Sequence, residues 1–280
     1  METARTIEEL RARVRAWRAQ GLRIGFAPTM GALHDGHLSL VEAARRDCDK
    51  VVVSIFVNPT QFGPNEDFDA YPRNEAADLG KLASVQTDLA YLPAVAEMYP
   101  PGSLTTVNVS GITEGLCGAA RPGHFQGVTT VVTKLLLQVL PDAAFFGEKD
   151  YQQLKVITRM ARDLDIPTRI IGVPTMREAD GLALSSRNVY LSATERKNAL
   201  ALPRVMQEVV KRLADGSMAA AHLAWGKDEL RRGGFDSVDY LELCDAEDLH
   251  PLGSVGSAPA RLIAAARIGK TRLIDNIAAG

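Results

Sequence analysis

The chain has 280 residues, 46% of them hydrophobic and 24% charged, so it can bury a substantial core, and disordered and fibrous classes are excluded. Its 32 Lys and Arg against 34 Asp and Glu leave a formal net charge of −2, which argues against a broad nucleic-acid or anionic-membrane surface. The three cysteines (Cys48, Cys117, Cys244) stand far apart without metal-ligand spacing, as free thiols of a reducing cytosol do. The charged N-terminus lacks the apolar stretch of a signal peptide, so we expect a cytoplasmic protein that binds neither nucleic acid nor membrane.

Up to residue 173, expected helices alternate with expected strands. Apolar residues spaced three and four apart predict helices at 6–18, 36–47, 75–84, 127–140 and 151–164. Short apolar runs between them predict strands at 23–27, 51–57, 88–92, 143–146 and 169–173. This alternation implies a Rossmann-like α/β fold, in which a parallel sheet carries helices on both faces. Ligands of such sheets bind outside the carboxyl ends of the strands.

The pattern changes after residue 173. Two helices are expected at 193–214 and 218–232, followed by alternating strands at 238–243, 261–266 and 271–274. A hairpin-like turn at 267–270 joins the last two strands. We therefore expect two domains, residues 1–173 and a smaller α+β domain at residues 174–280.

Two histidines, His34 and His37, stand three residues apart where the loop after the first core strand enters a helix. A helix N-terminus favours phosphate, because its N–H groups are unpaired and carry partial positive charge. The imidazoles could donate hydrogen bonds to a phosphate there, and Gly31 and Gly36 would let the backbone approach the ligand closely. The alternatives are a zinc pair, for which no cluster stands out to supply a third ligand, and two surface histidines, which the position after a βα turn disfavours.

Two further segments follow core strands and therefore fall on the same rim. Asn58 and Gln61 are neutral amides that could fix hydroxyl or carboxylate groups, although a plain turn at Asn58 explains them as well. Lys149 can meet a phosphate and Asp150 can cap a helix or hold Mg²⁺, with Gln153 one turn along; an ordinary helix start is the alternative.

The fourth segment lies at the domain boundary, where the second domain could fold over the rim. Ser185, Ser186 and Arg187 suit an oligophosphate, because a guanidinium group pairs phosphate oxygens bidentately. A polar linker is the alternative. Arg121 and His124 precede an apolar helix, and they could be no more than its entry.

These segments together closely resemble the pantoate–β-alanine ligase family over nearly the whole chain. The motifs that carry the resemblance, in the family's order and spacing, are PTMGALHDGH (28–37), FVNPTQF (56–62), DAYPR (69–73), RPGHF (121–125), FFGEKDYQQL (145–154) and ADGLALSSRN (179–188). The HxGH motif alone would indicate only the wider nucleotidyltransferase superfamily, whereas FVNPTQF, FFGEKDYQQL and LSSRN are more specific. The segment 115–120 departs from the family pattern at Cys117 and Ala119.

The resemblance implies activation of (R)-pantoate by ATP to pantoyl adenylate, release of pyrophosphate, and attack by β-alanine to give pantothenate and AMP. It also implies Mg²⁺ near Asp150, a homodimer, and closure of residues 174–280 as a lid over the nucleotide- and pantoate-binding domain. By position, catalytic roles fall on His37, His34, Lys149 and Arg187. ATP contacts fall on Met30, Gly31, Ala32, Leu33, His34, Asp35, Gly36, His37, Gly147, Glu148, Lys149, Asp150, Met176, Leu184, Ser185, Ser186 and Arg187. Contacts to pantoate and β-alanine fall on Gln61, Gln153, Asn58, Tyr71 and Arg121.

Three other functions share part of the pattern. A small cytidylyltransferase would have HxGH but would leave FVNPTQF and the paired glutamines unexplained. An aminoacyl-tRNA synthetase is disfavoured, because the balanced charge leaves no obvious basic tRNA-binding module. A non-catalytic ATP sensor stays open, and release of pyrophosphate on addition of pantoate would distinguish a ligase from it.

Overall fold

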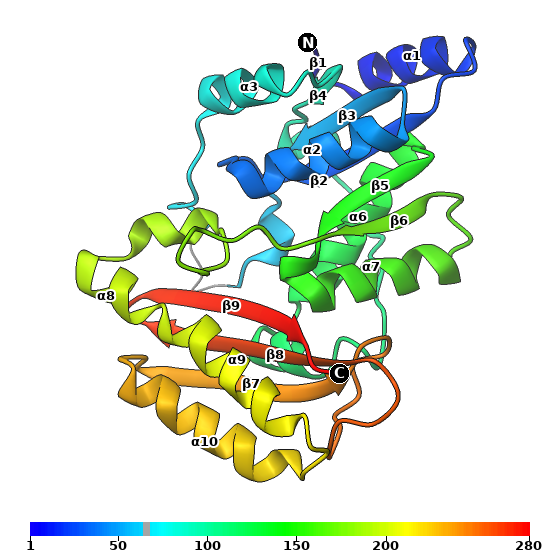
Figure 1. Cartoon of the computed structure of the whole chain (residues 1–280). Coiled ribbons are helices and arrows are strands. Elements are labelled where there is room, and N and C mark those ends of the chain that lie inside the picture. The colour runs from blue at the N-terminus through cyan, green and yellow to red at the C-terminus, as the bar shows by residue number, and fades with distance from the viewer. Residues whose placement is uncertain (64–67) are drawn as a thin grey trace.

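The computed structural model describes residues 1–63 and 68–280. Six parallel strands form the larger sheet (Figure 1), in the order β1-β4-β3-β2-β5-β6. The strands are β1 (Glu2–Ala4), β2 (Ile24–Thr29), β3 (Lys50–Ile55), β4 (Leu89–Tyr91), β5 (Ala143–Gly147) and β6 (Arg169–Val173). From β2 the chain moves outward to β3 and β4, then returns to the other side of β2 for β5 and β6. The order therefore reverses between β2 and β5, which is where a parallel sheet binds its ligand.

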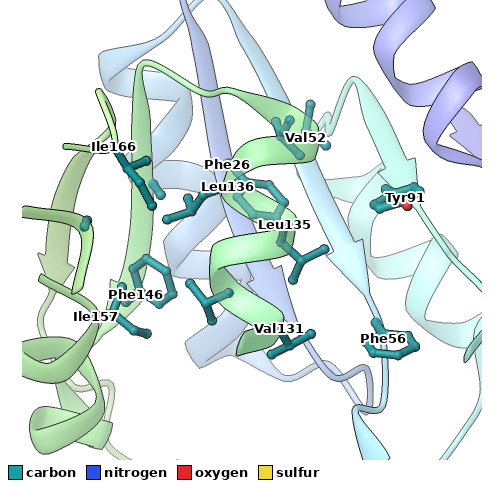
Figure 2. Packing of buried hydrophobic residues seen from close by; sticks show 14 of the residues in the cluster. Phe26, Val52, Phe56, Tyr91, Val131, Leu135, Leu136, Phe146, Ile157 and Ile166 are labelled. Atoms are coloured by element: carbon teal, nitrogen blue, oxygen red, sulfur yellow. The ribbon is translucent and has the colours of Figure 1, made fainter. Parts of the chain in front are cut away.

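Helices cover both faces of this sheet, as predicted. One face packs against α1 (Ile7–Arg18), α6 (His124–Val139) and α7 (Tyr151–Asp163), and the other against α2 (Asp35–Asp47) and α3 (Glu75–Ser84). Successive strand residues point to opposite faces. Phe26 and Val52 accordingly lie in the core with α6 (Figure 2), whereas Val51 and Val53 lie in the core with α2.

The C-terminal part is built on an antiparallel sheet of three strands (Figure 1). Its elements are α8 (Ala193–Asn198), α9 (Ala201–Leu213), α10 (Ala219–Arg232), β7 (Ser237–Asp245), β8 (Ala260–Ile268) and β9 (Thr271–Ala278). Leu241 and Leu243 of β7 pack with α9 and α10, whereas Tyr240 and Cys244 face the larger sheet's side of the molecule. One face of the small sheet is thus left to meet the N-terminal part.

The main departure from the predicted elements is the helix expected at 193–214. The prediction of one continuous helix is wrong, because α8 ends at Asn198 and a separate helix, α9, starts at Ala201. Pro203 explains the break: it has no N–H, and its ring would collide with the carbonyl of Ala199 in a continuous helix. Three further elements, β1, α4 (Val95–Met98) and α5 (Leu116–Ala120), were not predicted, because they are too short to show a periodic pattern. The hairpin between β8 and β9 is confirmed, and the domain boundary after residue 173 stays a prediction.

No helix in residues 1–63 and 68–280 combines the length and the apolar character that a bilayer crossing needs.

A glycine in α6 sets the distance between that helix and the 3-10 helix η1 (Pro59–Gln61). A Cβ atom on Gly127 would lie 2.3 Å from the carbonyl oxygen of Thr60 and 2.7 Å from Cα of Gln61. Both neighbours are backbone atoms, which cannot swing away as a side chain can. Any larger residue must therefore push η1, with Gln61 in it, away from the helix.

We predict that Gly127→Ala lowers the free energy of unfolding by about 1–3 kcal/mol, the usual cost of overpacking. Gly80 is a matched control, because it lies in α3 with no atom within 4 Å of an added Cβ. Gly80→Ala should raise stability by about 0.5–1 kcal/mol through helix propensity. Urea denaturation measures both, and a Gly127→Ala protein as stable as the parent would contradict the packing described.

Candidate active site

A cavity of about 1380 Å³ lies where the order of the larger sheet reverses. Its wall is formed by residues after β2, β3 and β5 and by residues of β8 and β9. The predicted site residues on this wall are Met30, His34, Gly36, His37, Asn58, Gln61, Tyr71, Arg121, Gly147, Lys149, Asp150, Gln153, Met176, Leu184, Ser185, Ser186 and Arg187. The remaining five predicted residues, Gly31, Ala32, Leu33, Asp35 and Glu148, are described by the structure but do not line the cavity.

A tight turn brings the chain from β2 into α2. Gly31 and Ala32 both have positive φ angles, 81° and 49°. Asp78, a buried residue of α3, holds the turn by accepting hydrogen bonds from the N–H groups of Ala32 (2.9 Å) and Leu33 (2.8 Å). Asp78 is not among the predicted site residues, although one signal marks it in the sequence: it stands four residues before Leu82 on the buried side of the helix.

The two histidines stack at the start of α2. Their ring centroids are 4.1 Å apart, and the backbone N–H of His34 donates to Nδ1 of His37 at 3.3 Å. Because Nδ1 of His37 accepts this bond, the proton of the neutral ring is on Nε2, which makes Nε2–H a donor. Nδ1 of His34 is buried and has no hydrogen-bond partner within the described residues. A buried polar atom of this kind calls for a ligand or a water.

Both imidazoles are uncharged at neutral pH. Burial lowers the pKa of His37 to about 3, helped by the neighbouring His34 and by Lys149. Burial also lowers the pKa of His34 to about 4, and the Lys149 ammonium lowers it further. Among the predicted ATP contacts, the positive charge therefore resides on Lys149 and Arg187, and the histidines act as neutral hydrogen-bonding groups.

The two amides after β3 differ in what they can offer a ligand. The carboxamide of Asn58 is buried and donates to Oε1 of Gln61 (3.1 Å) and to the carbonyl of Gly127 (3.2 Å), and its oxygen accepts from Tyr99 (2.9 Å). Asn58 thus fixes the position of η1. The amide nitrogen of Gln61 lies 3.1 Å from the sulfur of Met30, on the cavity wall.

Arg121 and His124 border Gln61 from the start of α6. Nδ1 of His124 lies 2.9 Å from the carbonyl oxygen of Gln61, and a guanidinium nitrogen of Arg121 lies 2.9 Å from Nε2 of His124. Tyr71 is buried near Arg187, whose guanidinium lies 6.0 Å from the tyrosine ring centroid. The Tyr71 ring also lies 5.9 Å from the ring of Phe62, so the three predicted segments at 56–62, 69–73 and 121–125 meet on one wall.

The paired glutamines of α7 both line the cavity, but they differ in their hydrogen bonds. Gln152 is buried and fully bonded: it donates to the carbonyls of Ile112 and Gly115 at 2.9 Å each and accepts from the N–H of Cys117 at 2.9 Å. Gln153 is half-buried on the cavity wall, and its amide makes no hydrogen bond to the described residues. Gln153 therefore has its donor and its acceptor available for a ligand.

The segment after β6 folds back along the cavity. Leu184 donates to the carbonyl of Met176 at 2.9 Å, and the hydroxyl of Ser185 accepts from the N–H of Arg187 at 3.2 Å, which starts the 3-10 helix η3 (Ser186–Tyr190). This arrangement brings Ser185, Ser186 and Arg187 to the same cavity as Lys149.

Carboxylates suitable for a metal ion are few on this wall. The group of three candidate ligands found within residues 1–63 and 68–280, Asp245, Asp248 and His250, does not line the cavity. Two of the carboxylates on the wall are already engaged: Arg177 binds both oxygens of Asp275, and Glu195 accepts from the N–H of Ser192 at 2.8 Å at the start of α8. Asp150 is exposed at the wall and lies next to Lys149, so it can offer an oxygen to a cation that phosphates also bind.

We predict that nuclear magnetic resonance titration will show no protonation of His34 or His37 between pH 8 and about 5. The unfolded chain protonates histidine near pH 6.5. The folded pKa values are about 4 for His34 and about 3 for His37. Titration of this pair therefore leaves the free energy of unfolding unchanged above pH 6.5 and lowers it as the pH falls toward 4 and 3, because the unfolded chain takes up protons that the folded protein does not. An imidazole of this pair that titrates near pH 6.5 would contradict the burial described.

Known proteins resemble this chain over its whole length. The family model for pantoate-beta-alanine ligase matches residues 2–278. The pantothenate synthetase of Rhodospirillum rubrum is 58% identical over 274 residues, which is 98% of this chain and 97% of that protein. That of Caulobacter vibrioides is 55% identical over 278 residues, 99% of this chain and 98% of that protein.

Solved structures of pantothenate synthetases also resemble the fold of this chain. The crystal structure of pantothenate synthetase from Thermus thermophilus has a TM-score of 0.91 and 49% identity, and the match covers 99% of both chains. The ligase from Francisella tularensis, complexed with beta-gamma ATP and beta-alanine, has a TM-score of 0.83 and 36% identity over 99% of this chain and 97% of that one. The resemblance noted in the sequence motifs is confirmed, and the chain belongs to the pantoate-beta-alanine ligase family.

Proposed function

We propose that this protein joins (R)-pantoate to β-alanine through a pantoyl adenylate, converting ATP to AMP and pyrophosphate. One observation carries the proposal for the site: a single cavity is lined by the neutral histidine pair, by Lys149 and Arg187, and by the amides of Gln61 and Gln153. The first groups suit a triphosphate, and the amides suit a small hydroxy acid.

In the first step a pantoate carboxylate oxygen bonds to the α-phosphorus of ATP, and the bond from that phosphorus to the bridging oxygen breaks. Negative charge builds on the departing pyrophosphate. Lys149 and Arg187 stabilise this charge, and the Nε2–H of His37 donates a hydrogen bond without adding charge to the ground state. The reaction therefore has donors aimed at the atoms where charge develops.

The acid is held by neutral groups. Gln61 and Gln153 can donate to the carboxylate or the hydroxyl of pantoate, and an amide does not neutralise the attacking carboxylate as a guanidinium would. In the second step the amine of β-alanine bonds to the acyl carbon, the carbon–oxygen bond to AMP breaks, and the amine loses a proton. Enclosure in the cavity limits hydrolysis of the mixed anhydride.

We further propose that Mg²⁺ takes part and that Asp150 holds it together with substrate phosphates. One carboxylate on the wall fits this ion, which commonly binds through one or two carboxylates plus phosphate oxygens. The ion would neutralise phosphate charge when bound. The homodimer, the lid role of residues 174–280 and the cytoplasmic location rest on the family resemblance and the sequence, and they stay predictions.

The experiment that tests the function is a reaction with each substrate omitted in turn. Purified protein with ATP, Mg²⁺, (R)-pantoate and β-alanine should form one AMP, one pyrophosphate and one pantothenate per turnover, measured by coupled pyrophosphate release and mass spectrometry. Pyrophosphate release that needs neither acid nor amine would instead favour a nucleotidyltransferase, and ATP binding without turnover would favour a sensor.

We predict that His37→Ala lowers turnover by about 10²–10³-fold, the usual effect of removing one transition-state donor. His222 is the matched control, because it lies in α10, away from the cavity, and contacts Ser217. Steady-state rates of His37→Ala and His222→Ala should differ by that factor while both proteins keep the circular dichroism spectrum of the parent. Near-parent turnover in a folded His37→Ala protein would remove the histidine from the mechanism.

The adjacent glutamines should respond oppositely to truncation. Gln153→Ala should raise KM for pantoate about 10-fold or more, because hydrogen bonds to a charged group are lost, and should leave Tm unchanged. Gln152→Ala should lower the free energy of unfolding by about 1–3 kcal/mol, because it removes the three hydrogen bonds of a buried side chain, two of them to the carbonyls of Ile112 and Gly115. If Gln153→Ala uses pantoate like the parent, the pantoate site lies elsewhere.

A further inference from the structure

Two adjacent polar residues of β9, Asp275 and Asn276, are buried at 1% and 3% exposure. The mechanism above uses neither of them. They belong to the C-terminal sheet, yet their side chains bond to segments of the chain that lie more than 90 residues earlier. Those segments carry two cationic residues of the cavity wall, Lys149 and Arg187.

The carboxamide of Asn276 holds the turn that contains Lys149. Its nitrogen donates to the carbonyl oxygens of Glu148 and Lys149, at 2.9 Å each. Its oxygen accepts from Nε of Arg261 at 2.8 Å, which fixes the orientation of the amide. Both N–H donors and the oxygen are thus used, and the group cannot rotate without losing all three bonds.

The turn receives little support from its own residues. It is the 3-10 helix η2 (Glu148–Asp150), and its N-cap residue, Gly147, has no side chain with which to cap it. Arg261 forms a second contact between the C-terminal sheet and this turn, an ion pair in which its guanidinium lies 3.2 Å from the Glu148 carboxylate. This contact explains why the Glu148 side chain is turned away from the cavity.

Asp275 secures the other cationic segment in the same way. Its two carboxylate oxygens accept from Arg177 at 2.7 and 2.8 Å, and Arg177 also donates to the carbonyl of Gly181 at 3.0 Å. The chain from Arg177 leads directly to Arg187 on the cavity wall. Neighbouring residues of one strand therefore hold the Lys149 turn and the base of the Arg187 segment.

We propose that Asn276 is a positioning residue for Lys149: it holds the backbone of η2 so that the Lys149 ammonium meets the phosphates of ATP. The inference rests on the proposed function only in taking ATP as the ligand of Lys149. Displacement of a cation by a fraction of an ångström weakens its contact with phosphate, and Asn276 acts on the backbone from which that cation extends.

The test is a double-mutant cycle on ATP binding, measured by calorimetry with ATP and Mg²⁺ in the absence of pantoate. Asn276→Ala should raise the Kd for ATP about 10-fold in the parent and less than about twofold in a Lys149→Met background. Equal factors in the two backgrounds would show that Asn276 acts independently of Lys149 and would overturn the proposal. Failure of the parent to bind ATP would overturn it as well.

Two variants keep the result interpretable. Asn276→Asp serves if Asn276→Ala fails to fold. It keeps the shape of the native residue but replaces the donor with an oxygen facing two carbonyls, so it should weaken ATP binding by at least as large a factor. Glu247→Gln removes another contact between the C-terminal part and α7, the 2.6 Å ion pair with Lys155, and should leave the Kd unchanged. Since no pantoate is present, a parent that binds ATP but makes no pantothenate would refute the ligase function and leave the cycle valid.

Discussion

Burial of an uncharged imidazole pair beside a lysine is the constraint on which the chemistry of this protein depends. Desolvation holds the pKa of His37 and His34 at about 3 and about 4, and the charge of Lys149 acts in the same direction. Protonated histidines would bind ATP tightly before any reaction, whereas neutral donors gain strength only as charge moves onto the leaving pyrophosphate. In the proposed reaction Lys149 and Arg187 would supply the positive charge that both binds the phosphates and stabilises the leaving pyrophosphate, and the neutral histidines would add hydrogen bonds without adding charge.

That constraint is met by parts of the chain that lie far apart in sequence. The turn before α2 is held by Asp78 of α3, and the turn before α7 is held by Asn276 of β9. The cavity thus has Gln61 and Gln153 on the larger sheet's side, and the turn that carries Lys149 is bonded to the small sheet. Because residues of both sheets line the cavity, we expect a change in the contact between the sheets to alter its geometry.

The local spacing of apolar residues was enough to predict the parallel sheet and the segments that meet at its rim, because a buried strand or an amphipathic helix shows its pattern within about ten to fifteen residues. It failed where the cause was distant or a single residue. Pro203 divides α8 from α9 although the apolar pattern runs on. Spacing places Gln153 on the same side of α7 as Asp150, but it does not show that the amide of the adjacent Gln152 is fully bonded, since that depends on where the loop around Cys117 packs. The role of Asn276 has no local signal, because the two carbonyls that it holds lie more than 120 residues away.

Incorporation of labelled pyrophosphate into ATP tests most directly whether this cavity activates the acid before the amine arrives. His37, Lys149, Arg187 and the two cavity glutamines are all present without β-alanine, so the first step has every group it needs. With pantoate, ATP and Mg²⁺ and no β-alanine, label should enter ATP at a rate comparable to overall turnover. Exchange that begins only when β-alanine is added would contradict a separate adenylate step and favour a concerted reaction of three substrates.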